Sequence, residues 1–196
     1  MKTQAAQTYT PRLRQKYSKE IVPMMMKEFN LKNPYQVPHL AKVVLNMGVK
    51  EGAQDIKVLD GIREELALIA GQRPVVTRAR KSISAFKLRE GSPIGLKVSL
   101  RGPRMYEFID RLFNVAMPRI RDFRGIADTG FDSQGNLSIG LQEQIIFPEV
   151  DFDKVKKIQG MDITFVTTST KKAESKRLLE LLGFPFRTPT PAKSGS

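Results

Sequence analysis

Two segments of the chain alternate between apolar and polar side chains, and this pattern limits the possible folds more than any other feature. The segments are residues 39–49, HLAKVVLNMGV, and residues 95–102, GLKVSLRG. Successive side chains of a β-strand point to opposite faces, so each segment is predicted to be a strand with one face in the core. The other face carries cations, an amide and a hydroxyl: Lys42, Asn46, Lys97, Ser99 and Arg101. Because an antiparallel sheet can leave one face in water, we expect an open, cationic sheet face.

The remaining elements follow from apolar spacing and from turn residues. They are helices over residues 10–32, 55–71, 103–117 and 171–183, short strands over 74–77 and 162–169, and a hairpin over 131–141. The first helix is expected to have Thr10 as its N-cap and to bend at Pro23. Its apolar side is predicted to be Leu13, Tyr17, Ile21 and Met24.

One domain is the simplest arrangement of these elements. The 196 residues can bury a sizeable core, and the chain contains no internal repeat and no linker-like stretch. The predicted fold class is α+β, a single domain over residues 10–187 with a mainly antiparallel sheet, helices on one face and an open cationic face. Residues 1–9 are expected to be a flexible tail, and the Pro-, Ser- and Thr-rich residues 188–196 a disordered one.

The net charge of +13 is informative about partners rather than about the fold. Nucleic acid is the commonest partner of such a surface, because its phosphates exchange counterions for Lys and Arg. An anionic membrane is the alternative, but the sequence has no Trp, no long apolar run and no secretory signal at its N-terminus. The absence of Cys excludes disulfides and thiolate metal sites.

The charge is distributed unevenly along the chain. Residues 71–104 hold nine basic and one acidic residue, whereas residues 126–162 hold three basic and seven acidic ones. This division predicts basic surfaces for RNA or DNA and a separate acidic surface for a different partner. Within the basic part, residues 73–95 join two strands and interleave cations with Ser82, Ser84 and Phe86, a combination that suits phosphate and ribose contacts.

No constellation of catalytic residues is visible. His39 is the only histidine, and no Gly-x-Ser-x-Gly, P-loop or Rossmann glycine pattern occurs. Asp151 and Asp153 are interpreted as charges at a helix N-terminus rather than as metal ligands. The sequence therefore predicts neither an enzyme nor a cofactor or metal.

Long motifs of the chain are similar to the bacterial large-subunit ribosomal protein L5 family. The resemblance covers about residues 10–187 and rests on VPHLAKVVLNMGV, ELALIAGQRPVVTRARKSISAFKLREGSPIGLKVSLRG, MPRIRDFRGI, NLSIGLQEQIIFPEVD, GMDITFVTTS and LLGFPF. It implies a cytoplasmic ribosomal protein that binds 5S rRNA in the central protuberance, among other large-subunit proteins. It also implies contacts with P-site tRNA through residues 78–91 and, through about residues 108–145, a bridge to a basic protein of the small-subunit head.

These implied contacts assign roles to three sets of residues. The rRNA-binding set contains three cations for phosphate and four donors for directional hydrogen bonds: Lys42, Lys97 and Arg101, with Asn46, Gln72, Thr77 and Ser99. The tRNA-contacting set is Arg78, Arg80, Lys81, Ser82, Ser84, Lys87 and Arg89. The protein bridge is assigned to Asp128 and Asp132. Two other classes stay open at this stage: a free-standing RNA- or DNA-binding regulator, and a small enzyme acting on a polyanion.

Overall fold

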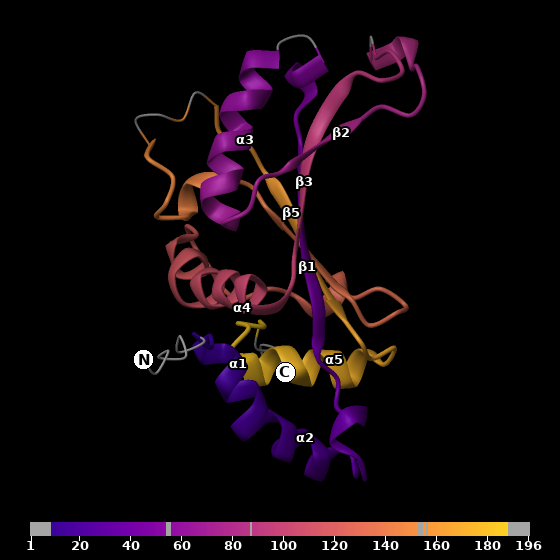
Figure 1. Ribbon diagram of the computed structural model, residues 1–196, viewed down its shortest axis with the longest axis vertical. Helices are drawn as coiled ribbons and strands as arrows, with labels where there is room; N and C mark the ends of the chain where they lie inside the picture. The colour runs from indigo at the N-terminus through magenta and orange to yellow at the C-terminus, as the bar shows by residue number, and fades with distance from the viewer. Residues whose placement is uncertain (1–8, 54–55, 87, 153–154, 156, 188–196) are drawn as a thin grey trace, which may run out of the picture.

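The computed structural model describes residues 9–53, 56–86, 88–152, 155 and 157–187. Its centre is a five-stranded sheet in the order β2-β3-β1-β5-β4, in which every neighbouring pair is antiparallel (Figure 1). The strands are β1 (Leu40–Gly48), β2 (Val75–Arg78), β3 (Pro93–Leu100), β4 (Leu137–Leu141) and β5 (Met161–Thr167). The predicted α+β class with an antiparallel sheet is confirmed.

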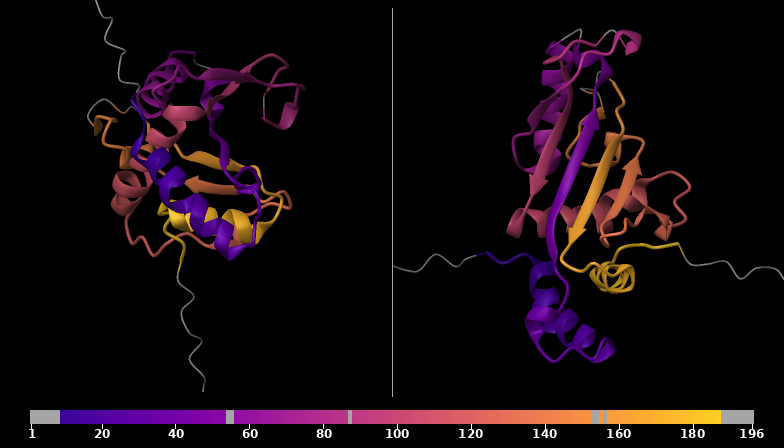
Figure 2. Two further views of the ribbon diagram at one scale, coloured as in Figure 1. Left: turned by 60° about the horizontal axis from the view of Figure 1, so that its bottom comes forward. Right: turned by 90° about the vertical axis from the view of Figure 1, so that its right-hand side faces the viewer.

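Helices α3 and α4 lie against one face of this sheet, and the other face is uncovered over its middle (Figure 2, right). The helices are α1 (Arg12–Lys16), α2 (Val22–Glu28), α3 (Ile56–Ala70), α4 (Gly102–Arg111) and α5 (Lys172–Leu182). The apolar positions of the strands and of α3 and α4 join one buried cluster, which includes Leu45, Val98, Phe165, Leu66 and Phe108. Helices α1, α2 and α5 gather at one end of the sheet (Figure 1).

Two helices end where glycine was expected to end them. Gly71 follows α3 with φ 62° and Gly183 follows α5 with φ 101°, a left-handed conformation that glycine adopts without the cost of a side chain. On α3, the apolar residues at helical spacing, Leu59, Ile62, Leu66 and Ile69, are buried, whereas Ile56 at the first position is 64% exposed.

The helical segments predicted over residues 10–32 and 103–117 each contain a π-helical turn just before a proline. The turns span Tyr17–Ile21, two residues before Pro23, and Leu112–Ala116, two residues before Pro118. Proline lacks an N–H and its ring clashes with the carbonyl of the preceding turn, and a wider turn relieves that clash. Since a π turn contains an additional residue, the apolar side is displaced beyond it. Met25 is therefore fully buried and Met24 is exposed, contrary to the prediction.

Three further details differ from the prediction. Helix α1 begins at Arg12 with Pro11 at the N-cap position, so Thr10 is not the cap. Strict alternation with Val43 and Leu45 would put Ala41 on the core face, but a bulge between Leu40 and Lys42 turns Leu40 into the core and leaves Ala41 exposed. The hairpin over 131–141 is reduced to a single bridge, because β4 pairs with β5 instead.

Most of the two predicted tails lies outside the described residues. Tyr9 is the exception, since its hydroxyl donates a hydrogen bond of 2.6 Å to Glu107 Oε1. This contact attaches the last residue of the predicted N-terminal tail to α4.

Candidate nucleic-acid interface

Cross-strand pairing assembles the uncovered side of the sheet, called here the open face. Asn46 pairs with Lys97 of β3 on one side and with Asp162 of β5 on the other. One step along β1, Val44 lies between Ser99 and Thr164. Since paired residues of an antiparallel sheet point to the same face, these side chains form two adjacent polar rows. The open face consists of Lys42, Val44, Asn46, Gly48, Val75, Thr77, Gly95, Lys97, Ser99, Ser138, Gly140, Asp162, Thr164 and Val166.

Five of the seven residues predicted to bind rRNA belong to this face. They are Lys42, Asn46, Thr77, Lys97 and Ser99. Arg101 follows β3 in an extended conformation, with φ −141° and ψ 163°, so it continues the same alternation and is exposed. Gln72 is not on the sheet, because it lies in the bend between α3 and β2.

The open face also carries groups that the sequence did not single out. Asp162 is an exposed carboxylate in the same row as Lys97, so the face is polar and mixed in charge rather than purely cationic. The Ser138 and Thr164 hydroxyls lie 3.0 Å apart and can act as donors or acceptors. A Cβ atom added at Gly48 would meet no atom within 4 Å, so there is free space above the open face at this residue.

The segment 78–91, called here the hairpin tip, extends the β2–β3 hairpin beyond the sheet (Figure 1). Backbone hydrogen bonds close it twice, from Ala79 N to Ser92 O at 2.9 Å and between Ile83 and Leu88 in both directions. Arg78 Nη1 donates to Gly91 O at 2.9 Å, and Ser82 Oγ accepts from Glu90 N at 2.9 Å. These two predicted tRNA-contacting side chains therefore also hold the shape of the tip.

The other described members of the tRNA-contacting set are exposed on the hairpin tip: Arg80, Lys81, Ser84 and Arg89. Lys87 lies outside the described residues. Phe86 is 77% exposed at the end of the tip, which leaves its ring available to a partner. The tip thus presents cations, a hydroxyl and an aromatic ring on a closed backbone frame.

Both residues assigned to the protein bridge have partners within the chain. Asp128 forms ion pairs with Lys176 at 2.9 Å and Lys172 at 4.0 Å, and the Lys176 hydrogen bond is the main cause of its lowered pKa. The carboxylate of Asp132 accepts hydrogen bonds from the backbone N–H of Gln134 and Asn136 and from the Asn136 side chain. The Asn136 contacts lower the pKa of Asp132, whose carboxylate closes the turn before β4.

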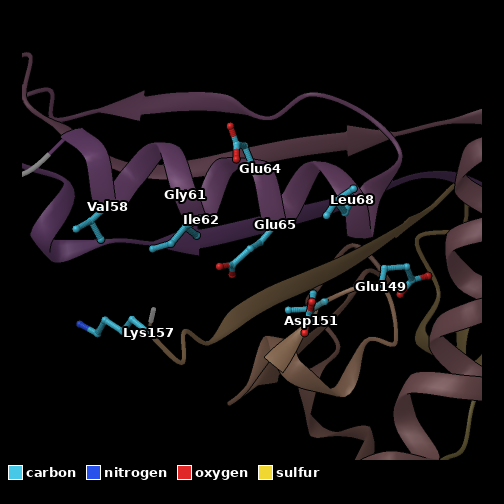
Figure 3. Close-up of a pocket in the computed structure, with 10 residues that line it drawn as sticks. Val58, Gly61, Ile62, Glu64, Glu65, Leu68, Glu149, Asp151 and Lys157 are labelled. Carbon is cyan, nitrogen blue, oxygen red and sulfur yellow. The ribbon is translucent and has the colours of Figure 1, made fainter. Parts of the chain in front are cut away.

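A second acidic surface lies between α3 on one side and residues 149–151 and Lys157 on the other (Figure 3). This acidic groove encloses about 330 Å³. Its lining combines apolar side chains with carboxylates and one ammonium group: Val58, Ile62, Leu68 and Val150, Glu64, Glu65, Glu149 and Asp151, and Lys157. Large apolar residues are exposed on its lining and nearby, with Leu68 at 62% and Phe152 at 69%.

Gln144 holds the two walls of the acidic groove together. Its side chain is fully buried and donates to Lys157 O at 2.8 Å and to Glu65 Oε2 at 3.2 Å. Its carbonyl oxygen accepts from Gln159 N at 2.5 Å. On the other side of the groove, Glu149 pairs with Arg111, which also donates to Ile69 O.

The described residues contain no cluster of three or more His, Cys, Asp or Glu that could hold a metal ion. None of the described helices is long and apolar enough to span a membrane. A strongly basic α+β domain with an uncovered polar sheet face and a cationic hairpin tip is typical of nucleic-acid-binding proteins rather than of enzymes.

Comparisons with known proteins agree with this class. A family model described as ribosomal protein L5 matches residues 33–89, and a model of the C-terminal part of the same ribosomal family matches residues 93–186. The large ribosomal subunit protein uL5 of Geotalea daltonii is 56% identical over 176 residues, covering 90% of this chain and 98% of that protein. Proteins of the same name from Thermoanaerobacter sp. and Citrifermentans bemidjiense are 56% and 57% identical, covering 89% and 90% of this chain and 98% of each protein. The chain belongs to the ribosomal protein L5 family.

This membership confirms the resemblance found in the sequence. The family consists of ribosomal proteins, so the chain is a non-enzymatic ribosomal protein and its location is the cytoplasmic ribosome. The enzyme alternative is thereby set aside.

Proposed function

We propose that this chain, a constituent of the large ribosomal subunit, binds 5S rRNA through the open face and helps to anchor it in the central protuberance. The observation that carries the proposal is the cross-strand register, which sets Lys97 and Asn46 side by side on a face whose middle is covered by none of the described helices. A helix-free polar face of a sheet is accessible to a large, rigid ligand such as folded RNA.

Each kind of group on the open face has a distinct role in this mechanism. Lys42, Lys97 and Arg101 neutralise phosphates, while Asn46 and Ser99 make directional hydrogen bonds to ribose, phosphate or exposed base edges. Asp162 repels phosphate, so it limits the positions that the RNA backbone can take on this face. Recognition depends on backbone and shape, because the deep major groove of A-form RNA hides base edges from side chains.

Binding of the purified protein to 5S rRNA and to a control RNA of similar length, at two salt concentrations, tests this proposal. We expect tighter binding to 5S rRNA at both concentrations. Equal affinity for the two RNAs would refute a dedicated 5S rRNA site and leave only non-specific phosphate attraction.

The hairpin tip is proposed to contact P-site tRNA. Its exposed cations and its distance from the middle of the open face support a second RNA contact (Figure 1). Replacing Arg80, Lys81 and Arg89 by Ala should lower retention of P-site tRNA on ribosomes that carry the variant and spare most 5S rRNA affinity. Loss of 5S rRNA binding with unchanged tRNA retention would place the tip in the rRNA site instead.

The acidic part of the chain, residues 126–162, is proposed to bind a basic protein of the small-subunit head. The acidic groove, which residues 149–151 and Lys157 of this part form together with α3, is a second candidate beside Asp128 and Asp132. The groove offers exposed apolar area together with carboxylates, which suits a basic segment with apolar side chains.

A comparison of two variants separates these candidates. Leu68→Ser removes exposed apolar contact area from the acidic groove without changing its charge, and the double reversal of Asp128 and Asp132 to Lys changes the other candidate. We expect weaker subunit association from the groove variant and unchanged 5S rRNA binding. If only the double reversal weakens association, the bridge lies at Asp128 and Asp132.

A further inference from the structure

Tyr35 is the most exposed large hydrophobic side chain that the structure describes, at 95%. It lies in a single 3₁₀ turn, Pro34–Gln36, between α2 and β1. An exposed tyrosine is common on protein surfaces and means little on its own. The backbone that carries this ring, and the charge around it, separate it from an ordinary surface residue.

The turn that carries Tyr35 is fixed from both sides. The Asn33 side chain accepts a hydrogen bond from Tyr35 N at 2.9 Å, and Pro34 fixes φ at the first position of the turn. Directly after the turn, Val37 is buried, and Tyr17 donates to the Pro38 carbonyl at 3.0 Å. The backbone is therefore held in place while the ring itself has almost no contact, which leaves it presented to solvent before any ligand arrives.

The charge of the sequence around Tyr35 favours phosphate. Residues 29–50 contain no Asp or Glu, and they include Lys32, Lys42 and Lys50. The nearest acidic residue before this stretch, Glu28, is paired with Arg177 at 2.8 Å. An apolar protein partner would not require this absence of carboxylates, whereas RNA would be repelled by them.

Tyr35 is also continuous with the open face. Strand β1 begins at Leu40, a few residues after the turn, and carries Lys42 and Asn46 along the open face. The turn lies beyond the end of the sheet where α1 and α2 gather, opposite to the hairpin tip (Figure 1). An RNA bound along β1 would therefore reach Tyr35 after it leaves the sheet.

We infer that Tyr35 is a stacking platform for an unpaired base of the RNA that occupies the open face. Aromatic side chains bind splayed bases through their π faces, and a tyrosine on a preformed turn loses little freedom on binding. This inference rests on the proposed function and extends the RNA site past the end of the sheet. The hydroxyl is not required for stacking, so the ring alone should suffice.

The chain contains no Trp, which makes a direct test possible. Tyr35→Trp introduces a single tryptophan whose fluorescence should be quenched when a base stacks on it during titration with 5S rRNA. Tyr9→Trp is the matched control, because Tyr9 is 72% exposed but lies beside the carboxylate of Glu107. We expect quenching and protection from acrylamide for Tyr35→Trp and neither effect for the control.

The affinity of Tyr35 variants for 5S rRNA is the second measurement. Tyr35→Ala should weaken 5S rRNA binding by about fivefold to a hundredfold, the range for losing one stacked base, and Tyr35→Phe should bind like the unchanged protein. Thermal unfolding should be alike for all variants, since the cap of the turn uses only the backbone N–H of this residue.

Normal affinity of Tyr35→Ala together with an unquenched Tyr35→Trp overturns the inference while leaving the open-face site intact. If the unchanged protein does not prefer 5S rRNA, the proposed function fails first. Normal RNA binding with poor incorporation into subunits would assign the ring to a protein contact and also overturn the inference.

Discussion

Replacing Lys42, Lys97 and Arg101 together by Ala should flatten the salt dependence of 5S rRNA binding. Lys97 and Arg101 are exposed and Lys42 is half-buried, and none of the three has an ion pair with another described residue. Each can therefore give its charge to one phosphate. Each phosphate contact contributes about 0.7–0.9 to the slope of the logarithm of the binding constant against the logarithm of the salt concentration. Loss of three contacts should therefore reduce the magnitude of this slope by about 2 to 3. When salt is raised from 50 to 200 mM, the fold-loss of affinity should be roughly 20 to 40 times smaller for the variant than for the unchanged protein.

The assay is a filter-binding or fluorescence titration at several salt concentrations with intact, folded protein. The control replaces Lys171, Lys172 and Lys176 by Ala, which removes the same net charge from residues that already pair with carboxylates. That control should change the slope much less. An unchanged slope in the folded open-face variant, or an equal change in the control, would refute the reasoning, because the effect would then come from total charge.

Four further predictions concern single positions. Asp162→Asn should raise 5S rRNA affinity by removing a repulsive charge from the open face, and a loss measured in the same titration would mean that the carboxylate accepts a hydrogen bond from a base. Gly95→Ala should lower the free energy of unfolding in urea by about 1–3 kcal/mol, because the new Cβ would lie 2.5 Å from a backbone carbonyl of β1, whereas Gly48→Ala meets no atom and should cost far less. Gln144→Leu should cost about 1–3 kcal/mol in the same assay, since it leaves buried partners across the acidic groove unsatisfied. Burial raises the pKa of Tyr17 to about 12. The folded state therefore favours the neutral phenol, so its contribution to stability should persist up to about pH 10 and be lost as pH rises towards 12; a tyrosine absorbance titration that ends near pH 10 would contradict this.

The open face was largely predictable from the sequence, because a strand has a period of two whatever surrounds it. The alternation in residues 39–49 and 95–102 placed Lys42, Asn46, Lys97 and Ser99 correctly on one side. The segment 162–169 predicts a strand but does not by itself show that Asp162 belongs to the open face. Its position beside Asn46 depends on pairing between β1 and β5, which are far apart in sequence.

Other features depend on contacts that local patterns do not contain. The pairing of β4 with β5 replaced the predicted hairpin, because a turn sequence such as the one before Leu137 does not determine the partner of the strand that follows. The acidic groove is formed by α3 together with residues 149–151 and Lys157, so it exists only in the folded chain. The exposure of Tyr35 is likewise a property of the fold, since burial of an aromatic residue cannot be deduced from its neighbours in sequence.

Because of the two π turns, the number of residues in each of these helices determines which way the side chains before the turn point. Deleting one residue within Tyr17–Ile21 would allow a regular α-helix, but it would rotate everything before it by about 100° about the helix axis. Arg12, which now meets Asp110 at 2.6 Å, would point elsewhere, and Leu13 would leave the core. The packing of α1 on α4 therefore depends on the one additional residue in the π turn. A length change there would disrupt the interface even if every side chain were retained.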